Sequence, residues 1–201
     1  ALTGAGMMYI VQLADGSYIV VDGGTYNLED TWGLRDFLVE HAPEGTKPTI
    51  ACWIYTHAHP DHIQLATEFI PKYAEEIEIK SFAHNFPSGE FVTTSDENDG
   101  TLIAAYKTLL KNDKTYYPDA VHYQIHAGQK FYFKGAEIEM LQTSEEFFPN
   151  SAVSWNDTSC AFKMTFDSGK TMMFLGDSQH VLCQQLEDTY KDYVKSDVLQ
   201  L

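Results

Sequence analysis

Short apolar runs alternate along the chain with segments in which apolar residues recur every three or four positions. The first kind of pattern predicts strands and the second predicts helices. The runs that predict strands are residues 7–13, 18–21, 49–55, 77–82, 121–125, 130–134, 136–142, 159–166, 171–176 and 197–201. The segments that predict helices are residues 30–41, 63–73, 99–111 and 180–193. Asp15-Gly16 between the first two strands predicts a hairpin, and Asp30 is the expected N-cap of the first helix.

This order of elements, in which strands alternate with helices and hairpins recur, predicts mixed sheets covered by helices. No internal repeat or linker-like segment divides the chain, so we expect one domain over residues 1–201. The last predicted strand reaches Leu201 without a polar tail. We therefore expect that this domain lacks its C-terminal portion.

Charge and hydropathy restrict the partners of the chain. With 13 basic and 29 acidic residues, its net charge is −16, which argues against strong non-specific binding to nucleic acid. No apolar run approaches the ~20 residues that a membrane span needs, so no membrane segment is expected in this chain. Nothing at the N-terminus resembles a signal segment. A start at Ala1 is compatible with a removed leader, so a cytoplasmic or a secreted location stays open, as does the oligomeric state.

The most informative stretch directly follows the apolar run 49–55 and reads His57-Ala58-His59-Pro60-Asp61-His62. Neutral imidazole and carboxylate are the usual ligands of zinc and similar divalent ions. On extended backbone, His57 and His59 point the same way and can reach one ion. Asp61 and His62 follow the turn at Pro60 and can address a second ion. A surface loop of solvated histidines is the alternative, but it does not explain so dense a group after a buried strand.

This stretch is the HxHxDH signature, and the chain resembles proteins of the metallo-β-lactamase fold. Two further stretches match the pattern of that family in the same order: Val20-Val21-Asp22-Gly23-Gly24 and Met173-Phe174-Leu175-Gly176-Asp177. The resemblance implies a four-layer αββα sandwich with two divalent metal ions at one edge of its two mixed sheets. Zinc is the expected ion, with manganese or iron as alternatives.

The resemblance also implies a role for each matched residue. His57 and His59 would hold the first ion, Asp61 and His62 the second, and Asp177 would bridge them. Asp22 would order the metal-binding loops. Water between the ions would lose a proton near neutral pH and act as the nucleophile, and Asp61 would also be catalytic, by orienting that water and helping to move its proton.

The chain departs from the family pattern at two places. A histidine that usually serves the first ion is missing from Ser154-Trp155-Asn156-Asp157-Thr158-Ser159. Asn156 or Asp157 would take its place as an oxygen ligand, and we favour Asp157, whose alternative role is an Asx turn or a strand cap. The family pattern also has a later histidine, after a further strand, and it is absent because the chain stops at Leu201. The metal site is therefore expected to be incomplete.

The run from Asn156 to Met164 resembles the hydrolase domain of DNA-uptake competence proteins and related phosphodiesterases. The expected function is therefore metal-dependent hydrolysis of a small-molecule or phosphodiester substrate. One alternative is a lactam or thioester hydrolase of the same fold, although those branches normally keep the missing histidine. His59 argues against the flavin-coupled di-iron oxidoreductases, which have glutamate there. The remaining alternative is a non-catalytic binding protein on a degenerate fold.

Overall fold

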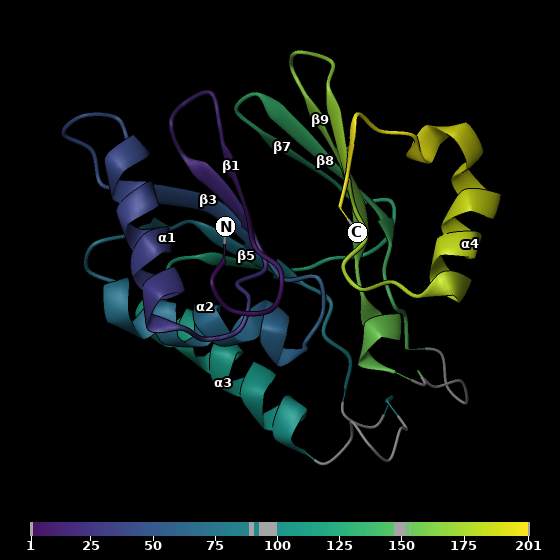
Figure 1. Ribbon diagram of the computed structural model, residues 1–201, viewed down its shortest axis with the longest axis horizontal. Coiled ribbons are helices and arrows are strands. Elements are labelled where there is room, and N and C mark those ends of the chain that lie inside the picture. The colour runs from purple at the N-terminus through teal and green to yellow at the C-terminus, as the bar shows by residue number, and fades with distance from the viewer. Residues whose placement is uncertain (1, 89–90, 93–99, 147–151, 153, 201) are drawn as a thin grey trace.

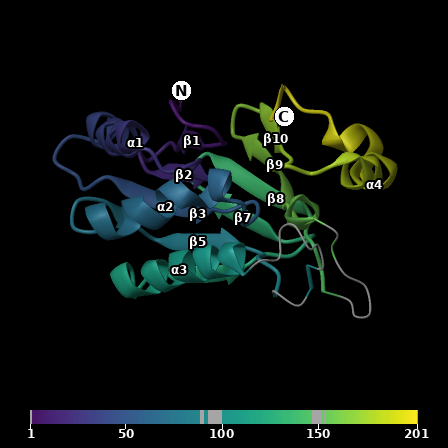
Figure 2. The same ribbon diagram turned by 60° about the horizontal axis from the view of Figure 1, so that its bottom comes forward.

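Two mixed sheets lie face to face in the computed structural model, which describes residues 2–88, 91–92, 100–146, 152 and 154–200 (Figures 1 and 2). The first sheet has the strand order β1-β2-β3-β5-β6, with β4 paired to β3. Its strands are β1 (Tyr9–Gln12), β2 (Tyr18–Val21), β3 (Thr49–Ile54), β4 (Glu78–Ile79), β5 (Ser81–His84) and β6 (Val121–Gln124). Strands β1 and β2 form the expected antiparallel hairpin, whereas β2, β3, β5 and β6 run parallel to one another.

The second sheet has the strand order β11-β10-β9-β8-β7. Its strands are β7 (Lys130–Phe133), β8 (Ala136–Gln142), β9 (Ala161–Phe166), β10 (Thr171–Phe174) and β11 (Val198–Leu199). Neighbouring strands are antiparallel except β10 and β11, which pair in parallel. Both sheets are therefore mixed, as expected.

In the described part of the chain, four α-helices cover the outer faces of the two sheets. Helices α1 (Leu28–His41), α2 (Pro60–Tyr73) and α3 (Thr101–Tyr116) lie on the first sheet, and α4 (His180–Tyr190) lies beside the second (Figures 1 and 2). Two short 3₁₀ turns, η1 (Trp155–Thr158) and η2 (Lys191–Val194), complete the elements. In the described ranges no helix is long and apolar enough to cross a membrane.

Three groups of buried side chains fill the three spaces between these four layers. Along β2, Tyr18 and Val20 pack toward the helices, whereas Ile19 and Val21 pack between the two sheets. All four are buried, because both faces of this strand are covered, and its sequence is accordingly a continuous apolar run. A third group, which includes Met173 and Leu186, joins the second sheet to α4. The predicted αββα sandwich is thus confirmed.

Several boundaries differ from the sequence-based predictions, and α3 extends to Tyr116 although it was expected to end at residue 111. Helix α1 begins earlier than expected, because Asn27 and not Asp30 is its N-cap and accepts a hydrogen bond from the Glu29 N–H. Helix α2 begins at Pro60, since proline suits the first position of a helix, where no N–H is needed. The run 77–82 forms two short strands that part at Lys80, and the second of them reaches His84. Strand β9 begins at Ala161, because the preceding residues form η1. Two residues at the ends of predicted elements, Asp99 and Leu201, lie outside the described residues.

Asp113 of α3 is a carboxyl group in an apolar setting. Its side chain is fully buried, and neither of its oxygens has a hydrogen-bond partner among the described residues. Burial raises the pKa of Asp113 well above its ordinary value, and nearby Lys114 opposes the shift only in part. The folded protein therefore binds this proton more tightly than the unfolded chain does. The resulting stability is complete below about pH 4 and declines as the pH rises toward the pKa of the folded state.

The Asp113→Asn substitution is expected to stabilise the protein at pH 7, because no buried group then has to stay protonated or ionise without a partner. Urea unfolding from pH 4 to pH 8 measures the effect. The gain over the unsubstituted protein should grow with pH by up to about 1.4 kcal/mol per pH unit. Asp119→Asn, at an exposed position after the same helix, is the control. An Asp113→Asn protein less stable than the unsubstituted one at pH 7 would contradict this reading of the core.

Candidate metal centre

Three loops meet at one edge of the sandwich, where strands of both sheets end. Strand β2 ends at Val21 and is followed by Asp22, and β3 ends at Ile54 and leads to His57. From the second sheet, β10 ends at Phe174 and leads to Asp177. The carboxyl ends of neighbouring parallel strands share one sheet edge, so the end of β2 and the end of β3 are brought together by the pairing of these strands.

The segment from His57 to His62 changes from extended backbone to helix at Pro60. His59 has φ −68° and ψ 147°, and α2 starts at the next residue. Residues 57 and 59 therefore lie on extended chain, whereas Asp61 and His62 occupy the first turn of α2. A carboxylate is favourable there because the N-terminal end of a helix carries partial positive charge.

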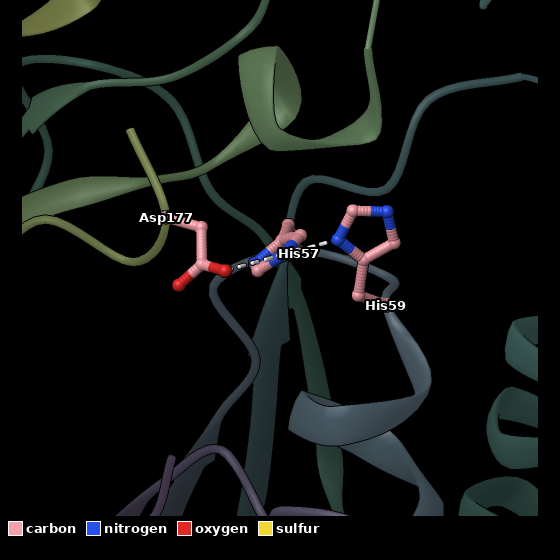
Figure 3. Close-up of side chains that lie close together, drawn as sticks. All are labelled: His57, His59 and Asp177. Atoms are coloured by element: carbon pink, nitrogen blue, oxygen red, sulfur yellow. Dashed lines mark hydrogen bonds and ion pairs between the residues drawn. The ribbon is translucent and has the colours of Figure 1, made fainter. Parts of the chain in front are cut away.

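His57, His59 and Asp177 form a first group of possible metal ligands. The Nε2 atom of His57 lies 3.0 Å from Nδ1 of His59 and 4.0 Å from Oδ2 of Asp177. Figure 3 shows the Asp177 carboxylate and the His59 ring approaching His57 from opposite sides. His57 is fully buried, so two imidazoles and one carboxylate converge on a point at the edge of the core.

Asp61, His62 and Asp177 form a second group, which shares Asp177 with the first. Nε2 of His62 lies 3.2 Å from Oδ1 of Asp177, and the ring centroids of His57 and His62 are 4.1 Å apart. Within each group, one donor atom per residue lies within 4.8 Å of the others. The five residues that the HxHxDH stretch and the last motif contribute are thus together in space.

Asp22 supports this cluster through buried hydrogen bonds. Its carboxylate accepts hydrogen bonds from the N–H and the hydroxyl of Thr56, both at 2.7 Å, and its Oδ2 lies 2.8 Å from Nδ1 of His62. Its backbone N–H donates to Ile54, and its carbonyl oxygen accepts from the Trp53 indole. Asp22 is fully buried and has φ 56°, a left-handed conformation that aspartate tolerates better than most residues. It therefore orients His62 and anchors the start of the loop.

The protonation states of the cluster suit metal binding. Burial lowers the pKa of His57 well below its usual range, and His62 and His59 lower it further. Its imidazole is therefore neutral, as a ligand must be. The interaction with His62 lowers the pKa of Asp177, which is ionised despite partial burial. Burial by itself would lower the pKa of His62, but Asp177 and Asp22 raise it to about 10. A divalent cation at Nε2 of His62 would replace the proton that faces Asp177, while Nδ1 stays hydrogen-bonded to Asp22.

Asn156 and Asp157, the two candidates for the place of the missing histidine, lie in η1, and their side chains are in different surroundings. The Asp157 carboxylate accepts a hydrogen bond from the Ser154 N–H in a capping box, and Asp157 belongs to neither ligand group. The side chain of Asn156 lies beside His57 and raises the pKa of that histidine. The Oδ1 atom of Asn156 is buried and has no hydrogen-bond partner among the described residues. The cluster therefore offers an unused oxygen donor next to His57.

Three supporting residues were not identified from the sequence: Thr56, Ser159 and Gln200. Ser159 accepts a hydrogen bond from the Asp177 N–H at 3.1 Å. Gln200 accepts one from the Leu175 N–H at 2.8 Å and donates one to the Gly176 carbonyl at 3.1 Å. Only Thr56 carried a sequence signal, a hydroxyl residue between a buried strand and a histidine cluster. Ser159 and Gln200 come from distant parts of the chain and depend on the tertiary fold.

A hollow of about 570 Å³ lies against the second ligand group. Asp61, His62, Asp177 and Gln200 are among the residues that line it. The rest of the lining comes from the N-terminal segment. Because the ligands face this open space, a small molecule placed there would reach ions held by them. We call this hollow the metal-side cleft.

The donor set fits divalent ions: neutral imidazole and ionised carboxylate suit zinc, manganese and iron. No family model matches the sequence, and no curated protein sequence matches it significantly. Solved structures do match. BJP-1, a subclass B3 metallo-β-lactamase of Bradyrhizobium japonicum, superposes with a TM-score of 0.53 at 14% identity, over 96% of this chain and 69% of that one. Zn²⁺-bound PqqB from Methylobacterium extorquens superposes with a TM-score of 0.50 at 12% identity, over 85% of this chain and 52% of that one.

A metallo-β-lactamase from Cronobacter sakazakii, a mutant of its HARLDQ motif, gives a TM-score of 0.47 at 14% identity, over 83% of this chain. The chain spans 56% of the length of that structure. At these identities the likeness concerns the fold. The mixed sheets, the covering helices and the ligand cluster at the sheet edge agree with it. The chain is therefore a protein of the metallo-β-lactamase fold.

Proposed function

We propose that the chain is a metal-dependent hydrolase with two divalent ions. The observation that carries the proposal is that two groups of ligands share one carboxylate, Asp177. His57 and His59 would hold the first ion, Asp61 and His62 the second, and Asp177 both. Zinc is the ion we favour, since His-rich sites suit it and one similar structure is zinc-bound. Manganese and iron fit the same donors.

Asn156 supplies the further ligand of the first ion in this proposal, in place of Asp157. The Asp157 carboxylate already serves the turn of η1, whereas Oδ1 of Asn156 is buried next to His57 without a hydrogen-bond partner among the described residues. An amide oxygen is a weaker donor than imidazole. The proposed site therefore has one oxygen ligand where the family pattern usually has a histidine.

The bound ions would polarise the substrate and lower the pKa of a bound water to near neutrality. The residues of the chain supply position and proton transfer. Asp61 lines the metal-side cleft, so its carboxylate can accept the proton of the attacking water and return it to the leaving group. His62 is kept in place by Asp22, and Asp177 by the hydroxyl of Ser159. These contacts limit the motion of the ligands during the reaction.

A phosphodiester is the substrate class that we favour. The support is the resemblance of residues 156–164 and of the following Gly176-Asp177 to competence-protein hydrolase domains. The two non-bridging oxygens of a phosphodiester, which share one negative charge, would also suit two cations with a shared ligand. A lactam or thioester hydrolase is the second candidate, favoured by the named lactamases among the similar structures.

A substrate panel on the His59→Ala variant and the unsubstituted protein tests the proposal. Bis-p-nitrophenyl phosphate, a phosphorylcholine ester, single-stranded DNA, a lactam and a thioester are compared. We expect a phosphodiesterase signal in the unsubstituted protein. His59→Ala should lower kcat/KM by about 10³-fold or more, because losing a ligand removes several kcal/mol of transition-state stabilisation.

His41→Ala is the matched control, since His41 is an exposed histidine at the end of α1, away from both ligand groups. It should keep the activity of the unsubstituted protein. Activity on the lactam or thioester alone would favour the second candidate. Phosphodiesterase activity that survived His59→Ala would refute the mechanism. A protein that binds no metal and hydrolyses none of the substrates would favour the binding-protein alternative.

A further inference from the structure

The lining of the metal-side cleft combines two chemically different sets of residues. One set is Asp61, His62 and Asp177, which belong to the ligand groups. The other set comes from the N-terminal segment and has no charged side chain. These residues are Leu2, Gly4, Gly6, Met7, Met8 and Tyr9. Methionine and leucine side chains offer an adaptable apolar surface, so a substrate that reaches the ions can also contact apolar groups of the same cleft.

Hydrogen bonds hold the N-terminal part of the lining in place. The carboxylate of Asp30 accepts hydrogen bonds from the Thr3 N–H at 2.7 Å and the Gly4 N–H at 2.9 Å. Near the cluster, the Met7 N–H donates to the Asp61 carbonyl at 3.1 Å. A side chain at Gly6 would collide with that same carbonyl, since a Cβ there would lie 1.9 Å from it. The segment is therefore fixed at both α1 and the start of α2, and the cleft keeps its shape.

No lysine or arginine lines this cleft. All 13 basic residues of the chain lie in its described part, and none is among the residues that line the cleft. The single arginine, Arg35, pairs with Glu76 on the outer helices. Proteins that bind several phosphates do so with lysines and arginines that displace counterions. Here only bound metal ions would supply positive charge, and the net charge of the chain repels further anions.

We infer that the substrate carries a single phosphodiester charge and an apolar organic ester group, and is not a chain of phosphates such as a polynucleotide. This inference rests on the proposed function. The phosphate would lie beside the ligand residues, and its ester group would contact Leu2, Met7 and Met8 in the N-terminal part of the lining. In the reaction, the oxygen of water bonds to phosphorus and one P–O ester bond breaks. The displaced oxygen takes up a proton, which gives an alcohol and a phosphomonoester.

Two p-nitrophenyl esters with the same leaving group test this inference. One is p-nitrophenyl phenyl phosphate, which has a single charge and an apolar group. The other is the p-nitrophenyl ester of trithymidylate 5′-phosphate, which carries three charges. We expect kcat/KM to be at least about tenfold higher for the phenyl ester at low salt, and the ratio to shrink as salt screens the repulsion. An equal or higher value for the trithymidylate ester would overturn the inference.

A positive charge placed in the cleft gives the second test. Leu2→Lys should improve kcat/KM for the trithymidylate ester severalfold relative to the phenyl ester. Leu28→Lys makes the same change at an exposed position of α1, 48% accessible and outside the cleft lining, and should leave the ratio unchanged. Equal effects of the two variants would overturn the inference. If neither ester is hydrolysed by metal-loaded protein, the proposed function itself fails, which separates the two failures.

Discussion

Replacing Asp177 by asparagine is expected to abolish hydrolysis and to reduce metal binding at both sites at once. Asp177 is the one residue common to both ligand groups, and its ionised carboxylate lies between His57 and His62. An amide has one neutral oxygen donor and cannot bridge two cations. We expect kcat/KM to fall by about 10³-fold or more, equivalent to roughly 4 kcal/mol of transition-state stabilisation.

The measurement combines metal content per chain with kinetics on a p-nitrophenyl phosphodiester. Asp167→Asn is a matched control, because Asp167 is exposed in the turn between β9 and β10 and loses the same charge. It should retain both metal and activity. An Asp177→Asn protein that keeps two ions and more than a tenth of the activity would show that the two ligand groups do not share a bridge.

The second large effect concerns Asp22, and it combines stability with metal binding. Asp22→Ala removes a buried acceptor for the N–H and hydroxyl of Thr56 and for His62. Hydrogen bonds to a charged group contribute about 1.5–3 kcal/mol each, and the Thr56 N–H would stay buried without an acceptor. Alanine at φ 56° adds strain of about 1 kcal/mol. We expect a loss of about 3 kcal/mol or more in the free energy of unfolding.

Asp22→Asn separates these contributions. Asparagine tolerates the left-handed backbone and can still accept from the Thr56 N–H, so it should lose less stability than alanine. It lacks the negative charge that orients His62, so metal affinity should still fall by about 10–100-fold. Urea unfolding and metal titration of the two variants measure both effects.

Asp15 provides an unusually close control for this experiment. Its carboxylate accepts from the N–H and hydroxyl of Ser17, the same kind of pair that Thr56 offers to Asp22, but it is exposed at the hairpin. Asp15→Ala should therefore cost little, since water replaces the lost partner. If Asp22→Ala and Asp15→Ala destabilise the protein equally, burial of Asp22 is not what makes it important.

The residues of the cluster could be found in the sequence because four of the candidate ligands lie in one short run. His57 and His59 alternate on extended chain, and Asp61 and His62 follow Pro60, so their spacing predicts positions for two ions. Asp177 could be assigned only through the resemblance, because the sequence around β10 does not indicate which other strand ends lie next to the end of β10. The layers could also be predicted from local patterns, because each strand and each helix has its own periodicity of apolar residues.

The remaining features depend on contacts between distant residues. Asp30 was expected to cap a helix, yet its carboxylate binds the backbone of Thr3 and Gly4, 27 and 26 positions away. The choice between Asn156 and Asp157 depends on the 3₁₀ turn of η1, which uses the side chain of one and directs the other toward His57. Gln200, which braces the turn before Asp177, lies 24 positions from the carbonyl that it contacts. Local patterns contain no signal for pairings of this length.

The metal content of the folded chain tests the central claim most directly. Protein purified without chelator is reconstituted with zinc, freed of excess metal by gel filtration, and measured by elemental analysis. The two ligand groups that share Asp177 predict close to two ions per chain. A result of one ion or none would contradict the two-metal centre and, with it, the hydrolase proposed here.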